Sequence, residues 1–296
     1  MSKYISGIEL PNGVIFNQYD RRPRLANAKL TLSVNIAGAR ILDLGCSSGY
    51  WSLILSDQAS EIVGIDHRAK QIEKGLRTIE ALGIKNVNLI YGDVRDPDVF
   101  KDLGCFDLVI AYGLMHRVSD PFSLFDLFSR LGKTILVEWR TPVLSGMEEL
   151  SLAYHSVNRY IDEANVKQIT GFKPSEIDKY GEYGFWDMTP GAVKNLAARN
   201  DFIYSKILGY HEYWGDDLIN INLLTRKGLR VRLKELINME TNLPFGKEQF
   251  KRIRCSMLLA QSQELLNNFL PQDGKVLTPP NWDWQLRQAW PLKTLS

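Results

Sequence analysis

The chain has 296 residues, enough for one substantial hydrophobic core or for a core with an appendage. Hydrophobic residues make up 45% of it and charged residues 24%, as in ordinary soluble proteins, and the formal net charge of +2 is too balanced to indicate a nucleic-acid binder. The three cysteines form no CxxC pair, so we expect neither a disulfide framework nor a metal site. We see no signal-peptide pattern and no apolar run that approaches the ~18 residues of a membrane span, so we expect a cytoplasmic protein without a membrane partner.

Residues 1–38 are irregular in sequence, and short apolar runs then alternate with amphipathic helical patterns. This alternation implies right-handed βαβ crossovers and a parallel sheet with helices on both faces. The expected strands are residues 39–44, 61–66, 87–91, 106–111 and 134–138, and the expected helices cover 50–56, 72–82 and 120–132.

The second half of the chain adds fewer strands. After a mostly helical stretch at 146–167, residues 201–208 and 217–225 are expected to form two neighbouring strands, which should be antiparallel because too few residues separate them for a crossover helix. Residues 226–296 are expected to be a helical appendage. Nine basic and three acidic residues between Arg226 and Arg254 are interpreted as a solvated helix face rather than a nucleic-acid site.

One loop and two further acids suggest a ligand site. Asp43–Gly49 (DLGCSSG) joins the first expected strand to the first helix, where glycines allow tight turns and the helix N-terminus offers free N–H groups. Asp66 closes the second strand, where it could accept ribose hydroxyls, and Asp93 follows the third, within reach of an adenine amino group. Such acids meet at the carboxyl edge of a parallel sheet, where open α/β sheets bind ligands.

The loop does not match a dinucleotide site. It cannot be aligned with G-x-G-x-x-G, and Asp43 would repel a pyrophosphate but attract an ammonium group. S-adenosylmethionine has an α-ammonium group, a ribose and an adenine, and no phosphate, so the residues favour this cofactor. An NAD-dependent oxidoreductase and a non-catalytic interaction module remain as alternatives.

Residues 39–140 resemble the class I methyltransferases in DLGCSSG, VGID, GDV and FDLVIAYGLMH. The resemblance extends over roughly 39–225 and implies a Rossmann-like α/β fold with a seven-stranded, mostly parallel sheet and an antiparallel C-terminal hairpin. Ser47 departs from the family, which usually has a glycine there, and it narrows the approach to the amino-acid end of the cofactor. The cofactor site implied by the resemblance comprises Arg22, Asp43, Gly45, Cys46, Ser47, Gly49, Asp66, His67, Asp93, Val94 and Tyr112.

The same resemblance sets the expected domains. They are a leader at 1–38 that covers the site, a methyltransferase domain at 39–225 with an insert at 141–188 near the acceptor pocket, and the appendage at 226–296. We expect Trp139, Tyr183 and Trp186 to line that pocket, with packing in the core as the alternative.

A narrower likeness concerns the acceptor. Segments 9–14, 19–23, 115–121 and 186–190 are similar to the tRNA wobble-uridine (5-hydroxyuridine) methyl- and carboxymethyl-transferase group, many members of which are unassigned small-molecule enzymes. No Asn/Asp-Pro-Pro-Tyr motif follows the fourth strand, which argues against exocyclic amino groups of bases. A small-molecule O- or N-acceptor is therefore expected, with RNA second. The transferred group and the oligomeric state stay open.

His116 is the candidate general base, because transfer to a hydroxyl or amine requires removal of a proton and histidine titrates near neutrality. The alternative is a histidine that lines the cofactor pocket or bonds to a loop. From the sequence alone, we favour the alternative.

Overall fold

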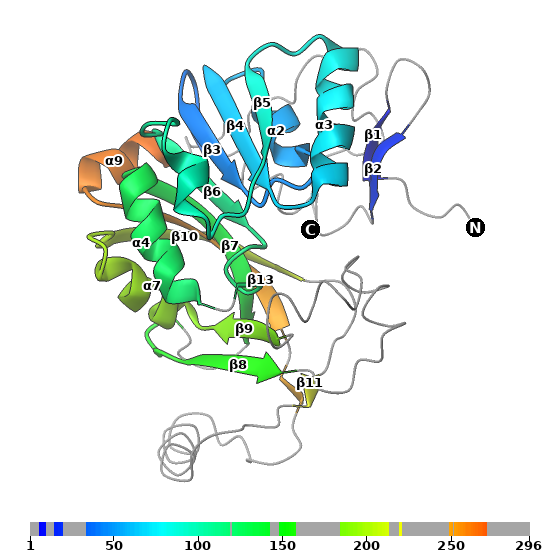
Figure 1. Cartoon of the computed structure of the whole chain (residues 1–296). Coiled ribbons are helices and arrows are strands. Elements are labelled where there is room, and N and C mark those ends of the chain that lie inside the picture. Colours follow the sequence, from blue (N-terminus) through cyan, green and yellow to red (C-terminus); the bar gives the residue numbers. More distant parts are fainter. Residues whose placement is uncertain are drawn as a thin grey trace, which may run out of the picture.

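The computed structural model describes residues 6–9, 15–19, 34–118, 120–142, 148–157, 184–212, 219–220, 249–250 and 252–270. Its central element is a seven-stranded sheet of strand order β10-β13-β7-β6-β3-β4-β5 (Figure 1). The strands are β3 (Arg40–Leu44), β4 (Glu61–Asp66), β5 (Val87–Tyr91), β6 (Leu108–Tyr112), β7 (Thr134–Pro142), β10 (Tyr204–Glu212) and β13 (Arg252–Ala260).

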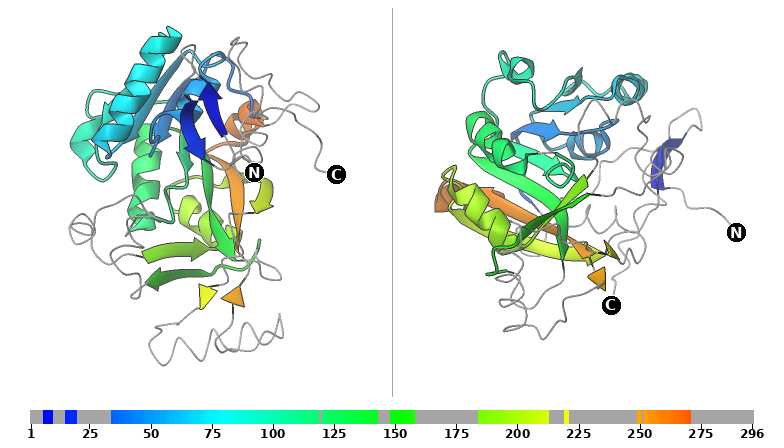
Figure 2. Two further views of the ribbon diagram at one scale, coloured as in Figure 1. Left: turned by 90° about the vertical axis from the view of Figure 1, so that its right-hand side faces the viewer. Right: turned by 60° about the horizontal axis from the view of Figure 1, so that its bottom comes forward.

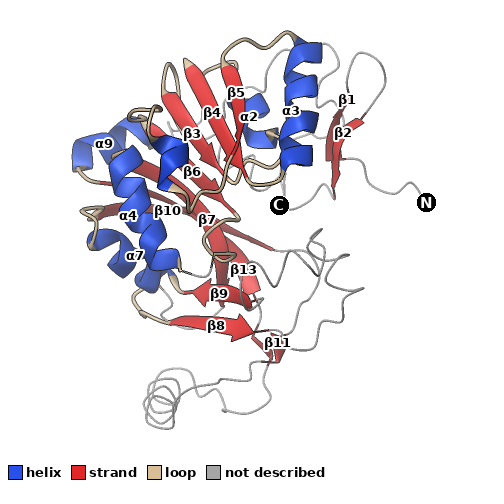
Figure 3. Cartoon of the chain, viewed as in Figure 1, coloured by secondary structure: helices blue, strands red, loops and turns tan. Residues whose placement is uncertain are grey.

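Helices cover both faces of this sheet (Figure 3). Leu53, Ile72 and Leu266 belong to the apolar layer on one face, and Phe125 and Val193 belong to the layer on the other. Because both faces are buried, the strands are almost continuously apolar, as parallel sheets require. The first face carries α2 (Tyr50–Leu55), α3 (Ala69–Leu82) and α9 (Gln263–Phe269), and the second carries η1 (Pro97–Phe100), α4 (Pro121–Leu131) and α7 (Pro190–Ala198).

The order of the parallel strands creates a topological switch point in the sheet. β3 pairs in parallel with β4 on one side and with β6 on the other, and β4–β5 and β6–β7 continue outward in parallel. The chain therefore reverses its direction of travel across the sheet between β5 and β6. In open α/β sheets such a switch point opens a ligand crevice outside the carboxyl ends of the strands.

The seven-stranded, mostly parallel sheet is confirmed, but the predicted partner in its antiparallel part is wrong. β10 pairs antiparallel with β13, which lies between β10 and β7, instead of with residues 217–225. Ile219–Asn220 (β11) instead pairs with Gln249–Phe250 (β12) in a separate two-stranded sheet. The apolar run 257–260 at the end of β13 suits a position buried on both faces, whereas the alternating pattern of 217–225 suits a half-exposed strand.

This pairing also corrects the domain boundary after residue 225. β13 and α9, expected in a helical appendage, are part of the sheet and of its helical cover. Apart from β12, residues 226–251 and 271–296 lie outside the described residues, and so does most of the basic segment.

Two further corrections concern the ends of the predicted domain. The leader contains two strands, Ser6–Glu9 (β1) and Ile15–Tyr19 (β2), which pair antiparallel. The insert contains a hairpin of Ala153–Val157 (β8) and Gly184–Met188 (β9) instead of helix at 153–157. β9 of this hairpin contacts the carboxyl-terminal half of β7 (Figure 2). Within the described parts of the chain, no helix has the length and apolarity to cross a membrane.

Candidate active site

The loop after β3 has the left-handed backbone that its glycines allow. Gly45, Ser47 and Gly49 have φ values of 73°, 57° and 77°. A side chain is disfavoured in this region, which explains why glycine is the usual residue at position 47 and makes Ser47 a strained substitute. At Gly49, a Cβ atom would lie 2.9 Å from Leu89 Cδ1, so a larger residue would also have to displace this methyl group.

Backbone hydrogen bonds fix this loop over the end of β4. The amides of Gly45 and Cys46 both donate to the carbonyl of Ile65, at 2.8 and 3.1 Å. The amide of Ser47 donates to the carboxylate of Asp66 at 2.8 Å. Cys46 turns its side chain into the core, and burial raises the pKa of its thiol well above the ordinary value, so the side chain is structural.

Asp43 lies inside β3, one residue before its end, and is buried. Its carboxylate accepts a hydrogen bond of 2.7 Å from the hydroxyl of Ser52 on α2. Burial raises the pKa of Asp43 to about 6, because its charged form has lost most of its water. A positively charged group placed beside Asp43 would favour the ionised form.

Asp43 should therefore make the protein less stable as pH rises. The folded chain holds the proton more tightly than the unfolded chain, whose pKa is 3.8, so the free energy of unfolding falls as pH rises from about 4 to about 6. Asn at position 43 can keep the hydrogen bond to Ser52. We expect Asp43→Asn to raise the free energy of unfolding by about 1–2 kcal/mol at pH 8 and by much less at pH 4.5. Urea unfolding of both proteins at the two pH values measures this, and an equal loss of stability at both would refute it.

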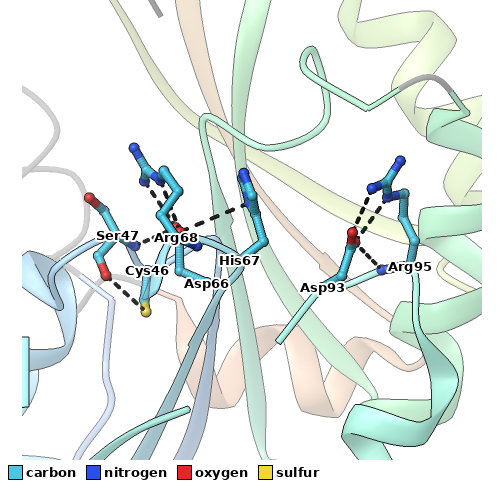
Figure 4. A network of polar contacts seen from close by, with 7 residues as sticks. All are labelled: Cys46, Ser47, Asp66, His67, Arg68, Asp93 and Arg95. Carbon is cyan, nitrogen blue, oxygen red and sulfur yellow. Dashed lines mark hydrogen bonds and ion pairs between the residues drawn. The ribbon is translucent and has the colours of Figure 1, made fainter. Parts of the chain in front are cut away.

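Asp66 ends β4 and is held by an arginine two residues further on (Figure 4). Its carboxylate accepts three bonds from Arg68, namely from the backbone amide (2.9 Å), Nε (2.9 Å) and Nη2 (3.0 Å), besides the bond from the Ser47 amide. Burial raises the pKa of Asp66, but the hydrogen bonds and charge of Arg68 outweigh it and hold the pKa below its ordinary value. An ionised carboxylate is thus fixed at the end of β4.

The same arrangement recurs after β5. Asp93 accepts hydrogen bonds from the backbone amide and Nε of Arg95, both at 2.9 Å, and from its Nη2. These bonds hold the pKa of Asp93 below its ordinary value. His67 lies between the two aspartate–arginine pairs (Figure 4), and burial lowers its pKa.

A second polar group lies after the end of β6 and beside the second half of β7. His116, in the loop after β6, is 1% exposed, and its carbonyl accepts a hydrogen bond of 3.0 Å from the amide of Trp186 on β9. Arg254 Nη1 lies 3.5 Å from both ring nitrogens of His116 and donates to Glu138 Oε1 at 2.7 Å. Three segments distant in the sequence, the loop after β6, β7 and β13, therefore meet here.

A second buried ion pair adjoins the first. Arg140 Nε lies 3.4 Å from Asp187 Oδ1, which joins β7 to β9. Arg140 stands opposite Arg254 in the sheet register, and Glu138 lies two residues away on the same face of β7. We call the five residues His116, Glu138, Arg140, Asp187 and Arg254 the ion-pair cluster.

The aromatic residues predicted in the acceptor pocket have different positions. Trp139 is fully buried in the core, and its indole N–H donates to the carbonyl of Met188 at 2.7 Å. The Trp139 side chain points to the face of β7 opposite its neighbours Glu138 and Arg140, so the prediction that it lines the pocket is wrong and its alternative, packing in the core, holds. Trp186 is partly buried and packs edge to face on Phe122, with ring centroids 6.5 Å apart.

The remaining predicted residues divide into two groups. Tyr112, at the end of β6, is partly buried and packs edge to face on Trp51 of α2 at 5.3 Å. Val94 is partly buried beside Asp93. Arg22 and Tyr183 lie outside the described residues. Sequence reasoning missed the four charged members of the ion-pair cluster, although charged residues within apolar strand sequences were a visible signal.

Comparison with known proteins agrees with this architecture. Residues 36–165 match the model of a family described as a methyltransferase domain. Demethylmenaquinone methyltransferase of Bacillus cereus (strain ATCC 10987 / NRS 248) is 29% identical over 125 residues, which are 40% of this chain and 52% of that protein. A protein of the same name from Bacillus anthracis (strain A0248) matches to the same extent. The chain thus spans about half the length of these curated relatives.

Solved structures share the fold at low sequence identity. The N-terminal domain of EvdMO1, crystallised in the presence of SAH and D-fucose, has a TM-score of 0.55 and 18% identity, covering 88% of this chain and 91% of that one. The YcgJ protein from Bacillus subtilis has a TM-score of 0.50 and 13% identity, covering 82% and 100%.

The fold and the loop after β3 define a Rossmann-like α/β domain. Within it, residues 36–165 match the family described as a methyltransferase domain.

Proposed function

We propose that the chain transfers the methyl group of S-adenosylmethionine to an oxygen or nitrogen atom of a small-molecule acceptor. The observation that carries the proposal is a row of three acids at the adjoining ends of β3, β4 and β5, namely Asp43, Asp66 and Asp93. The row lies beside the loop after β3, whose backbone is left-handed at three positions. The name of the Bacillus relatives, demethylmenaquinone methyltransferase, indicates a small-molecule acceptor for those proteins and supports this class of acceptor.

The residues present fit such a cofactor. Carboxylates at the strand ends suit hydroxyl, amino and ammonium groups, which donate hydrogen bonds or carry positive charge. Within the described residues, the buried hydroxyl of Ser48 in the loop has no hydrogen-bond partner, so a polar group could still be bound there. We assign the ribose to Asp66, the adenine to Asp93, and the methionine moiety to Asp43 and the loop.

The reaction asks little covalent chemistry of the chain. When bound, the cofactor supplies a methyl group that its sulfonium already activates. The chain's task is to hold the acceptor in line with that group and to exclude water. Trp186 and the β8–β9 hairpin, beside the ion-pair cluster, are proposed to form the acceptor side of the site.

A label-transfer assay tests the class of acceptor. The full chain is incubated with methyl-labelled S-adenosylmethionine and either a deproteinised low-mass extract or total RNA. We expect label in the low-mass fraction only. Label in RNA alone would overturn the small-molecule proposal.

Arg68 should compete with the cofactor for Asp66. A carboxylate offers about four lone-pair positions, and Asp66 already accepts four hydrogen bonds, three of them from Arg68. A ribose can therefore bind only if the guanidinium of Arg68 moves away. We expect Arg68→Gln to bind S-adenosylmethionine about threefold to tenfold more tightly, since a half-exposed ion pair is worth up to about 1 kcal/mol.

Calorimetry measures this effect, with Arg77→Gln as the matched control. Arg77 forms an ion pair with Glu73 on the exposed side of α3, so its loss should leave the affinity unchanged. Weaker binding by Arg68→Gln would show that Arg68 supports the cofactor instead of competing with it.

A further inference from the structure

Burial of the charges in the ion-pair cluster costs desolvation free energy, and no residue of the cluster is assigned to the cofactor. Arg254, Glu138, Arg140 and Asp187 are each at most 7% exposed. Buried ion pairs stabilise a fold poorly, because desolvation of the charges offsets their attraction, and apolar residues of similar volume often serve as well. The position of the cluster around a buried histidine at the carboxyl edge of β6 and β7 suggests a chemical role.

The distances show how Arg254 meets His116. Nη1 lies 3.5 Å from both Nδ1 and Nε2 of the ring. In the plane of the ring, equal distances of this length would force Nη1 into collision with Cε1, which lies between the two nitrogens. Nη1 of the guanidinium must therefore lie over the face of the imidazole, where a cation is attracted to an aromatic ring.

A cation over the ring disfavours a second positive charge. Because arginine keeps its charge in proteins, Arg254 should lower the pKa of His116 and keep the ring neutral near pH 7. Glu138 faces the same pair from β7, holds Nη1 at 2.7 Å, and partly offsets the charge of Arg254. From β9, the Trp186 amide bonds to the His116 carbonyl, and Asp187 is paired with Arg140.

We propose that Arg254 and Glu138 are positioning residues that hold His116 neutral and oriented, so that the imidazole accepts the proton of the acceptor. This inference rests on the proposed function. A neutral imidazole has one nitrogen with a lone pair, which a general base requires. The acceptor oxygen or nitrogen gives its proton to that nitrogen and forms a bond to the methyl carbon. The electron pair of the carbon–sulfur bond passes to sulfur, and the imidazolium later releases its proton to water.

The pKa of His116 can be measured directly by NMR on the full chain, without cofactor or acceptor. The chain has four histidines, and comparison with His116→Asn assigns the Cε1–H signal of His116. We expect the titration midpoint to rise by about one pH unit or more in Arg254→Met, which removes the cation. It should fall in Glu138→Gln, which removes a negative charge from beside the cation.

The opposite signs separate this role from structural damage, which has no reason to move the two midpoints in opposite directions. Arg254→Lys keeps the charge and should keep most of the lowered pKa, and Arg254→Gln, which also removes the cation, replaces Arg254→Met if the methionine variant does not fold. Arg77→Met, at an exposed ion pair, is the control and should change nothing. Midpoints that stay fixed, or that move in the same direction, would overturn the proposal.

The titration and the proposed function can fail independently. Absence of S-adenosylmethionine binding in calorimetry would refute the function but would leave the titration result intact. Once an acceptor is known, the acid limb of the pH–rate profile should move in the same directions in the two variants, while KM for S-adenosylmethionine stays nearly constant.

Discussion

Replacement of His116 by asparagine is expected to lower the turnover number ~10²-fold or more while the affinity for S-adenosylmethionine changes little. Asparagine keeps a polar side chain but cannot take up a proton near neutrality. The buried position of His116 beneath Arg254, at the carboxyl edge of β6, favours this outcome over the pocket-lining role that the sequence alone suggests.

Steady-state kinetics with the acceptor found by label transfer, together with calorimetry for the cofactor, distinguishes the two roles. A histidine that only lines the cofactor pocket would show the reverse pattern, with weaker binding of S-adenosylmethionine and nearly normal turnover at saturation. That pattern would remove His116 from the chemistry and leave the ion-pair cluster without the function proposed for it.

Replacement of Asp66 by alanine is expected to weaken binding of S-adenosylmethionine about tenfold to a hundredfold, the scale of losing hydrogen bonds to a charged acceptor. Asp66 is the buried, ionised group at the end of β4, and it also holds the Ser47 amide of the loop. Its loss removes both the proposed ribose ligand and a support of the loop.

Asp107→Ala is the matched control. Asp107 also accepts a hydrogen bond from a backbone amide, that of Arg40 at 2.8 Å, but at the start of β3, the opposite edge of the sheet. Its loss should reduce stability without changing the affinity for the cofactor. Equal affinities of Asp66→Ala and the parent chain, with both folded, would exclude Asp66 from the site.

The parallel part of the fold could be predicted from sequence because its signals are local. Each strand is a short apolar run, and α4 has a start signal in Asp120, which accepts hydrogen bonds from the first turn of the helix as expected. β13 could not be placed in this way. Its partners β7 and β10 are distant in the chain, and its order in the sheet depends on which strand is buried on both faces.

The site shows the same division. Asp66 and Asp93 were predicted at strand ends because chain order alone brings parallel strand ends together. Their arginine partners follow two residues later in both cases, a spacing visible in the sequence but not interpreted there. The ion-pair cluster depends on β13 lying beside β7, so it could not be predicted until that pairing was known.

Calorimetric titration of the parent chain with S-adenosylmethionine tests the central claim most directly, with NADH fluorescence as the parallel measurement. The account predicts saturable binding at one site per chain, competition by S-adenosylhomocysteine, and no enhancement of NADH fluorescence. No detectable heat with S-adenosylmethionine from a folded sample, or a saturable rise in NADH fluorescence, would contradict it.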